Sequence, residues 1–397
     1  MPAARLIFFC TASREWQSSE NTARQKRKWA AIFAGTSYSV RLRVGSELFV
    51  GDFMPDVVTF GEAMMRLSPP HFQRLEQTTT LDVQVGGGEL NVAVGVARLG
   101  LKSAWVSRLP KNSLGRLTEN RARQAGVDAS HVVWASDPEA RLGLYFVEFG
   151  AAPRASSVLY DRRNSAISAI QPGEVNWQKV MEGARWFHTS GITPALSDSA
   201  AAVTREALKA AKQAGLTVSY DLNYRGKLWP PDKAQAVQEP LMEHVDVLIT
   251  TEEDTSVVFK IKAEGKTDEK GFSQVSAESY KEVARRLQEK FRFQAVAITL
   301  RENPLVWRNT WTAIAYAGGK FYDDVKYELE IVDRLGGGDS FSAGFIYGRL
   351  TKNSYEAAVR YGNAFSALKH SMPSDFNWAT LSEVEGLLKG ASLRVAR

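Results

Sequence analysis

Residues 331–345 read IVDRLGGGDSFSAGF, so three consecutive glycines lie between an apolar segment and a segment with helical character. Glycines let backbone N–H groups crowd around an anion, and a helix start adds a positive dipole end. Asp339 follows directly, and its negative charge would oppose simple anion binding. A carboxylate there is better explained as a general base that takes a proton from a hydroxyl while the amides of Gly336, Gly337 and Gly338 hold a phosphoryl group.

The glycine run could also be purely structural, because a triple glycine before a helix is often only a tight turn. The chain has no Walker A loop at the required spacing; the nearest approach is GVARLGLKS at residues 95–103, where Leu101 separates Gly100 from Lys102. The dinucleotide fingerprint is also absent, because Phe341 stands where its third glycine belongs. Two common nucleotide-binding motifs are thus excluded for this segment.

Bulk composition indicates an ordinary soluble chain. The 397 residues are 44% hydrophobic and 24% charged, and no apolar run approaches the roughly 18 residues of a membrane span. The single cysteine, Cys10, excludes an intramolecular disulfide and a cysteine-based zinc site. A reducing, cytoplasmic location is therefore expected.

The first 53 residues differ from the rest. They carry eight basic and four acidic side chains, which is most of the net charge of +6, and the remaining body has no basic stripe suited to nucleic acid. The apolar run after Arg5 is too short for a secretory signal, and the acidic residues argue against a targeting peptide. We expect residues 1–53 to be an N-terminal extension outside the fold, and residues 54–397 to form one domain.

Beyond this extension, strand and helix patterns alternate, which predicts a mostly parallel sheet with helices on both faces. Strands are expected at 56–61, 103–109, 184–189, 217–223, 245–250 and 295–300, and helices at 89–99, 200–214, 279–290, 355–370 and 381–388. Residues 261–276 are polar and are expected to form a surface loop or an extra helix.

Alternating strands at about 66–85 and 141–165 interrupt this rhythm and predict a small accessory sheet. Its exposed apolar face is compatible with dimerisation. Ligands of such folds bind at the carboxyl ends of parallel strands. Five polar or glycine-rich segments would meet there: 86–91, 221–225, 250–254, Arg301 and 336–339.

Two segments, GGGELNVAVGVARLG at 86–100 and DRLGGGDSFSAG at 333–344, resemble the two signatures of the ribokinase-like (PfkB) sugar-kinase family. The resemblance covers nearly all of residues 54–397. Within the family the chain looks most like 2-keto-3-deoxygluconate kinases, through GLYFVEFG, VLYDRRNSAIS, SGITPALS, DLNYRGKLW, TLREN and KHSMPSDFN. The resemblance implies a three-layer αβα sandwich with a mostly parallel central sheet and a small β-sheet lid. It also implies ATP and Mg²⁺, an acid-sugar substrate, no nucleic-acid or membrane partner, and a homo-oligomer that dimerises through the lid strands.

The resemblance assigns roles to particular residues. Asp339 looks like the base, and the three glycines look like the hole for the γ-phosphate. The implied substrate-binding residues are Gly87, Gly88, Asn91, Tyr145, Tyr160, Arg162, Arg225 and Asp375. The implied nucleotide-binding residues are Asn223, Arg225, Thr299, Arg301, Gly336, Gly338 and Asn363.

The residue pattern supports an acid substrate independently. Arginine is suited to form two parallel hydrogen bonds to a carboxylate. Arg162 lies two residues after Tyr160, so both side chains would point to the same face of a strand. Core packing explains Tyr145 and Tyr160 equally well. A salt bridge to Asp221 is the alternative for Arg225.

The chain departs from the family pattern at three places. The usual Asn-x-x-Glu that organises magnesium appears as TEED at 251–254, which leaves Asp254 and Glu253 as weak metal candidates. LREN at 300–303 replaces the usual Lys-x-Gly nucleotide loop. Asp333 is kept but Arg334 replaces the common Thr, which remains compatible with a monovalent cation such as K⁺ nearby. His188 is expected to be a packed or capping residue, and His370 is the other histidine near these segments.

Three functions are consistent with this sequence. The first is ATP-dependent phosphorylation of 2-keto-3-deoxygluconate to its 6-phosphate. The second is another kinase of the same fold, acting on fructose, ribose or a nucleoside. The third is a catalytically inactive sugar sensor, for which the altered segments 251–254 and 300–303 would mark lost nucleotide binding.

Overall fold

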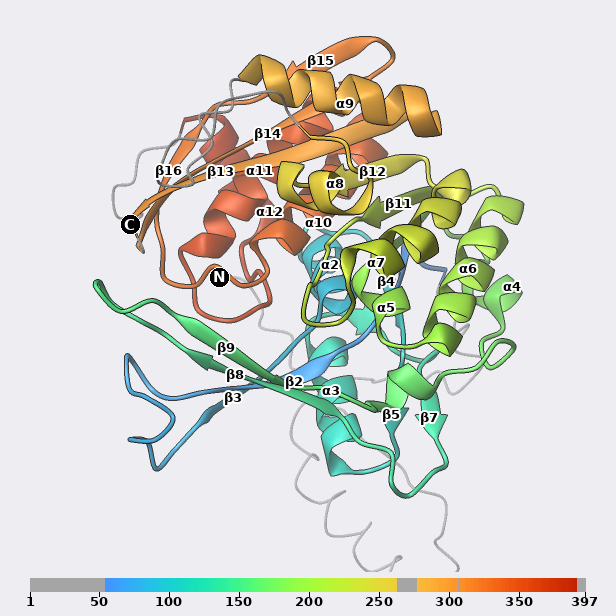
Figure 1. The fold of residues 1–397 in the computed structure, drawn as a ribbon, viewed down its shortest axis with the longest axis vertical. Coiled ribbons are helices and arrows are strands. Elements are labelled where there is room, and N and C mark those ends of the chain that lie inside the picture. Colours follow the sequence, from blue (N-terminus) through green and yellow to red (C-terminus); the bar gives the residue numbers. More distant parts are fainter. Residues whose placement is uncertain (1–53, 263–276, 306, 391–397) are drawn as a thin grey trace, which may run out of the picture. The chain divides into compact units, whose positions relative to one another are not determined.

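The computed structural model describes residues 54–262, 277–305 and 307–390 (Figure 1). The predicted N-terminal extension and nearly all of the polar segment 261–276 lie outside the described residues. None of the described helices is both long and apolar enough to cross a lipid bilayer.

A large sheet forms the centre of the domain, in the order β15-β14-β13-β12-β11-β10-β1-β4-β6, with β16 also paired to β14. Neighbours from β13 to β6 are parallel, whereas β14 pairs antiparallel with β13, β15 and β16. Its strands are β1 (Val57–Phe60), β4 (Ser103–Val106), β6 (Val127–Asp128), β10 (Trp186–Ser190), β11 (Thr217–Asp221), β12 (Val247–Thr250), β13 (Ala295–Leu305), β14 (Arg308–Ala317), β15 (Lys320–Asp323) and β16 (Tyr327–Glu330).

Helices cover both faces of this sheet. They are α2 (Gly88–Arg98), α3 (Ser113–Gln124), α4 (Trp177–Val180), α5 (Ile192–Ala195), α6 (Asp198–Gln213), α7 (Pro231–Gln238), α8 (Glu252–Val258), α9 (Ala277–Phe291), α10 (Gly337–Lys352), α11 (Tyr355–His370) and α12 (Leu381–Leu388), with 3₁₀ turns η1 (Ala166–Ala169) and η2 (Glu239–His244).

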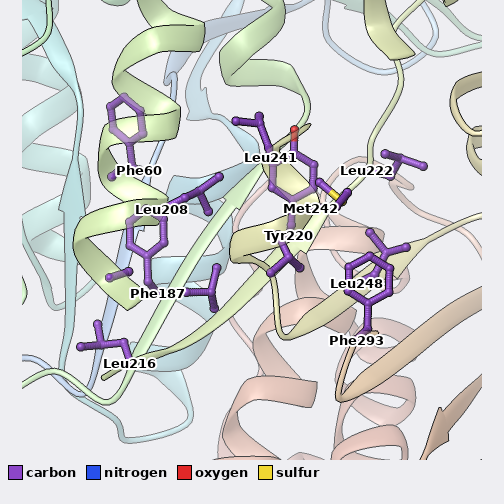
Figure 2. Packing of buried hydrophobic residues seen from close by; sticks show 14 of the residues in the cluster. Phe60, Phe187, Leu208, Leu216, Tyr220, Leu222, Leu241, Met242, Leu248 and Phe293 are labelled. Carbon is purple, nitrogen blue, oxygen red and sulfur yellow. The ribbon is translucent and has the colours of Figure 1, made fainter. Parts of the chain in front are cut away.

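Strand alternation explains the three layers. Val57 packs into a core cluster with α2, α10 and α11, whereas the next residue, Val58, packs into a second cluster with α6 and α9. Part of that second cluster, including Phe187 and Leu248, is shown in Figure 2. Because both faces of the strands are buried, they read as continuous apolar runs.

A separate small sheet has the order β3-β2-β8-β9 and lies to one side of the main sheet in Figure 1. Its strands are β2 (Met64–Ser68), β3 (Asp82–Gly86), β8 (Gly143–Glu148) and β9 (Ser157–Asp161), and a two-stranded ribbon joins β5 (Arg108–Pro110) to β7 (Val133–Ala135). The expected α/β class with a small accessory sheet is confirmed. Leu159 and Val83 of the small sheet are exposed, with 60% and 43% of their surface accessible.

Sequence patterns located most elements well, and α11 and α12 begin and end where they were expected. The single strand expected at 103–109 is wrong. The chain leaves the main sheet after Val106, so that residues 108–110 pair with β7 instead. The helix α3 and the antiparallel strands β14, β15 and β16 were not predicted.

Candidate active site

The loop before α10 has a shape that only glycine permits. Gly336 has φ of +80°, and a Cβ there would lie 2.2 Å from the carbonyl oxygen of Asp375. A Cβ on Gly337 would lie 2.6 Å from Cε1 of His370. A Cβ on Gly338 would meet no heavy atom within 4 Å. The open side of the loop therefore faces free space at the start of a 16-residue helix, whose first N–H groups lack partners within the helix.

Asp339 lies where the first turns of two helices meet. The side-chain amide of Asn91 on α2 donates a 2.6 Å hydrogen bond to Oδ2 of Asp339 on α10. Oδ1 of Asn91 accepts from the backbone N–H of Gly87 at 3.3 Å. A Cβ on Gly87 would lie 2.0 Å from the carbonyl oxygen of Glu62, so glycine is required here too. One Asp339 oxygen is thus held by Asn91, and the other lies toward Gly88.

A cavity of about 380 Å³ opens beside this carboxylate, at the carboxyl ends of β11 and β12. It is lined by Asp221, Asn223, Arg225, Ile249, Thr250, Thr251, Glu252, Glu253, Asp254, Tyr280, Thr299, Leu300, Trp311, Arg334, Leu335, Gly336, Gly337, Gly338, Asp339 and His370. Five polar or glycine-rich segments were expected at strand ends. Residues of segments 221–225, 250–254 and 336–339 line this cavity, and Asn91 of segment 86–91 contacts Asp339 beside it.

Acidic side chains crowd the cavity and perturb one another. Burial raises the pKa of Asp339 to about 6, against the opposing hydrogen bond from Asn91. Burial likewise raises the pKa of Asp254 to about 6, although Arg225 opposes the shift. Burial, and then the charges of Asp254 and Asp339, raise the pKa of Asp221 well above its usual range. Acidic side chains outnumber the two arginines among the residues that line the cavity.

Several of the residues expected to bind the substrate lie on or next to the small sheet. The rings of Tyr145 and Tyr160 stack with centroids 5.9 Å apart, and the Tyr145 hydroxyl donates to Oδ2 of Asp375 at 2.6 Å. The guanidinium of Arg162 lies 5.7 Å from the centroid of the Tyr160 ring, so the two side chains do share a side. Arg162 is nearly buried.

Glu62 balances the charge of Arg162. Its carboxylate forms a buried ion pair with Nη2 of Arg162 and accepts a 2.5 Å hydrogen bond from the Ser165 hydroxyl. Nε of Arg162 makes no hydrogen bond to any described residue. Arg225, in contrast, is exposed, and its guanidinium donates only to the carbonyl oxygen of Tyr224, at 3.1 Å, among the described residues.

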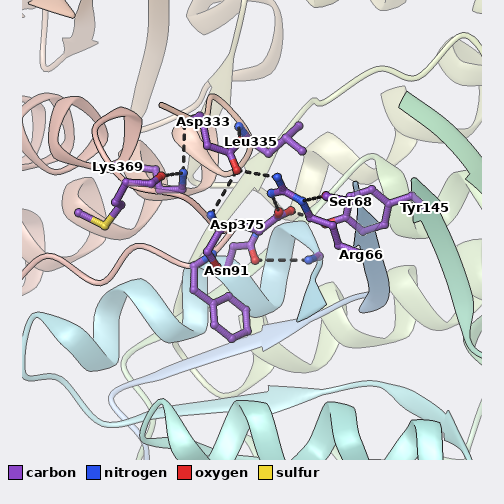
Figure 3. A network of polar contacts seen from close by, with 12 residues as sticks. Arg66, Ser68, Asn91, Tyr145, Asp333, Leu335, Lys369 and Asp375 are labelled. Carbon is purple, nitrogen blue, oxygen red and sulfur yellow. Dashed lines mark hydrogen bonds and ion pairs between the residues drawn. The ribbon is translucent and has the colours of Figure 1, made fainter. Parts of the chain in front are cut away.

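A buried ionic network lies beneath the glycine loop (Figure 3). Arg66 of β2 contacts Asp333 at 2.7 Å and Asp375 at 2.6 Å. Asp333 also accepts from the backbone N–H groups of Leu335, at 3.0 Å, and Ser374, at 3.2 Å. Burial lowers the pKa of Arg66, but the carboxylates of Asp375 and Asp333 outweigh it and raise that pKa. The network therefore connects β2 of the small sheet to the chain segments on both sides of the glycine loop.

The structure brings most of the residues expected from sequence together, with some exceptions. Asn363 is fully buried and donates to Asp324 and to the carbonyl oxygen of Val325, and it does not line the cavity. Thr299 lines it, but the side chain of Arg301 lies outside the described part of the chain. Asp254 and Glu253 both line the cavity, yet no cluster of three acidic, His or Cys side chains is arranged to hold a metal within the described ranges.

His188 and His370 lie in different environments. His188 is buried against the Ser219 hydroxyl, and burial lowers its pKa to about 3, so it is a packed neutral residue, as expected. His370 lines the cavity, with Nδ1 2.7 Å from the carbonyl oxygen of Ser366.

Sequence reasoning missed four charged residues around the site. Asp221 lay within the expected strand-end segment 221–225 but was given no role of its own beyond a salt bridge with Arg225, although its position at the end of β11 was a usable signal. No local sequence pattern marked Glu62, Arg66 or Lys369 as a site residue. The partners of Glu62 and Arg66 lie 100 and 309 residues away in the sequence. Lys369 donates to backbone carbonyl groups, which any residue carries.

Loss of the Arg66 guanidinium should destabilise the fold. Arg66→Met leaves Asp333 and Asp375 buried without their cation, so the free energy of unfolding in urea should fall by about 3–5 kcal/mol. The matched control is Arg185→Met, which breaks an exposed pair with Asp56 and should cost less than about 1 kcal/mol. Equal losses for the two variants would show that the network contributes no special stability.

Comparison with known proteins agrees with this geometry. The chain is 37% identical to a 2-dehydro-3-deoxygalactonokinase of Haloferax volcanii, over 86% of this chain and 99% of the relative. It is 31% identical to a 2-dehydro-3-deoxygluconokinase of Bacillus subtilis, over 81% and 91%. The crystal structure of 2-dehydro-3-deoxygluconokinase from Thermotoga maritima superposes with a TM-score of 0.79 at 42% identity, covering 84% of this chain and 99% of that one.

More distant structures share the fold. A putative ribokinase II from E. coli, solved in complex with ATP and Mg²⁺, has a TM-score of 0.70 at 19% identity over 85% of this chain and 100% of that one. Residues 54–375 match the pfkB family carbohydrate kinases, and the chain belongs to this family of sugar-phosphorylating enzymes.

Proposed function

We propose that this enzyme phosphorylates an acid sugar with ATP and that Asp339 is its general base. The observation that carries the proposal is the position of Asp339, which lies on the first turn of α10, directly after a glycine whose open side faces the cavity. Asn91 holds one carboxylate oxygen at 2.6 Å and leaves the other for a substrate hydroxyl. A general base within hydrogen-bond reach of a hydroxyl is what alcohol phosphorylation requires.

The substrate hydroxyl gives its proton to Asp339 while its oxygen forms a bond to the γ-phosphorus. The bond from that phosphorus to the bridging oxygen breaks, and ADP leaves with the electron pair. Backbone N–H groups at the start of α10 stabilise the charge on the transferred group, since they are already oriented and need no reorganisation.

The cavity suits a nucleotide that arrives with a divalent cation. Arg225, Thr299 and the glycine loop line one continuous cavity and are suited to contact the phosphates. Asp221, Asp254 and Glu253 line the same cavity, and burial raises the pKa values of the first two. These carboxylates would hold Mg²⁺, directly or through water, and the ion would supply charge neutralisation for the phosphates.

We propose 2-keto-3-deoxygluconate as the substrate and its 6-phosphate as the product. Relatives named for 2-dehydro-3-deoxy-gluconate and -galactonate support a keto-deoxy acid. Two arginines are the candidates to bind the carboxylate: Arg225 has no ion pair with a described residue, and Arg162 lies beside Tyr160 with a buried Nε that has no hydrogen-bond partner among the described residues. The alternative is a fructokinase, a ribokinase or another sugar or nucleoside kinase of this family.

Replacement of the base should abolish turnover and spare binding. Asp339→Asn keeps the shape of the side chain and removes its basicity, so kcat should fall by about 10³-fold while the sugar dissociation constant changes little. The matched control is Asp232→Asn on the exposed surface of α7, which should leave kcat unchanged. A loss below tenfold in Asp339→Asn would place the base elsewhere.

The pH profile should report the perturbed carboxylates. Asp339 must be ionised to act, so kcat/KM should rise as pH increases through about 6. Asn91→Leu removes a hydrogen bond that favours the ionised form, and the acidic limb of the profile should therefore move to higher pH. Asn120→Leu, on an exposed position of α3, is the control and should leave the limb unmoved. A limb that moves to lower pH in Asn91→Leu contradicts the assignment.

A substrate panel tests the acid sugar. The keto-deoxy acids should give a higher kcat/KM than fructose or ribose. Replacing Arg162 alone would leave Glu62 buried and unpaired, so the informative variant is Glu62→Gln combined with Arg162→Met. Loss of a charge-assisted hydrogen bond predicts a fall of about 10- to 100-fold in kcat/KM for the acid and little change for fructose. An unchanged preference would remove Arg162 from carboxylate recognition, and a higher kcat/KM on fructose would favour the alternative substrate class.

A further inference from the structure

Lys369 is a buried cation for which the proposed reaction has no use. It lies near the end of α11, has no exposed surface, and Nζ donates to the carbonyl oxygens of Asp333 at 3.2 Å and of Met372 at 3.3 Å. Burial lowers the pKa of Lys369, and the nearby carboxylates of Asp333 and Asp375 oppose that shift. Figure 3 shows this ammonium group beside the network of Arg66 and Asp333.

Asp333 is the residue that made a K⁺ site plausible from the sequence. Such a site needs several oxygen atoms that converge and remain available as ligands, typically main-chain carbonyls. Here the Asp333 carboxylate accepts from Arg66 and from the N–H groups of Leu335 and Ser374. Its carbonyl oxygen, and that of Met372, accept from Lys369. These oxygen atoms of Asp333 and Met372 therefore already accept from donors of the chain.

The charge balance leads to the same conclusion. Two buried carboxylates, Asp333 and Asp375, are matched by two buried cations, Arg66 and Lys369. A third cation beside these four side chains would add a buried charge with its own desolvation cost. The residues present therefore do not fit an exchangeable K⁺.

We infer that Lys369 serves as a built-in monovalent cation, so that the enzyme needs no K⁺ or other activating monovalent ion. Its ammonium joins the strand-side end of the glycine loop, at Asp333, to the segment after α11, at Met372. It acts as a positioning residue for the loop that precedes Asp339. The inference concerns the proposed kinase reaction, but its structural part is independent of which sugar is the substrate.

The wild-type enzyme gives the first test. Thermal unfolding is measured in KCl, NaCl and choline chloride at equal ionic strength, and kcat/KM is measured in the same three salts. We expect the same Tm and, within about twofold, the same kcat/KM. A Tm that rises specifically with K⁺, or a tenfold loss of kcat/KM in choline chloride, would overturn the inference. Because Tm needs no substrate, this test stands even if the proposed sugar is wrong.

Removal of the ammonium gives the second test. Lys369→Met keeps an unbranched chain and frees the carbonyl oxygens of Asp333 and Met372. The variant should unfold at a lower temperature in choline chloride, and K⁺ or NH₄⁺ should restore part of the loss in both Tm and kcat. Lys233→Met, at an exposed pair with Asp198, is the matched control and should show no cation response. A Lys369→Met variant whose Tm and kcat equal those of wild type in choline chloride would contradict the assigned role.

Discussion

The glycine loop depends on the carboxylate of Asp333. This side chain binds Arg66 from the small sheet and the N–H groups of Leu335 and Ser374 from the two chain segments that flank the loop. With Asp375, which is also bound by Arg66 and by Tyr145, it joins β2, β8, the start of α10 and the segment after α11. A buried pair of this kind adds less stability than its Coulomb energy suggests, because desolvation offsets much of it. Its more important consequence here is geometric, since Gly336 then packs on the Asp375 carbonyl and Asp339 is directed toward Asn91.

This arrangement shows why the local part of the site was predictable. Glycine requirements and helix starts are properties of a few consecutive residues, so the run 336–339 indicated both the loop and its carboxylate. The same holds for Asn91, which lies one turn into a helix that begins after a run of glycines. Both helices start near the carboxyl edge of the parallel strands, where ligands of such folds bind, although the strands that precede them, β3 and β16, pair antiparallel.

The remainder of the site depends on partners that are distant in the sequence. The ion pair of Arg162 with Glu62 spans 100 residues, and that of Arg66 with Asp375 spans 309. No local pattern marks such a pair, and the sequence showed Arg162 as a cation available to a substrate, without its counter-charge. The antiparallel strands β14 to β16 were missed for a related reason. They contain alternating residues like any half-buried strand, and nothing in that pattern says that they extend a parallel sheet at its edge.

The charged side chains on the two sides of the glycine loop are arranged differently. Beneath it, Arg66 forms ion pairs with the carboxylates of Asp333 and Asp375, and Lys369 donates to the carbonyl oxygen of Asp333. Above it, acidic side chains outnumber the two arginines of the cavity lining, and burial raises the pKa values of Asp221, Asp254 and Asp339. In a kinase the charge on that upper side must change during every turnover, as nucleotide and metal enter and leave and as the base gains and loses a proton. The excess of acidic side chains on that side leaves room for a divalent cation that arrives with the nucleotide, as the proposed reaction requires.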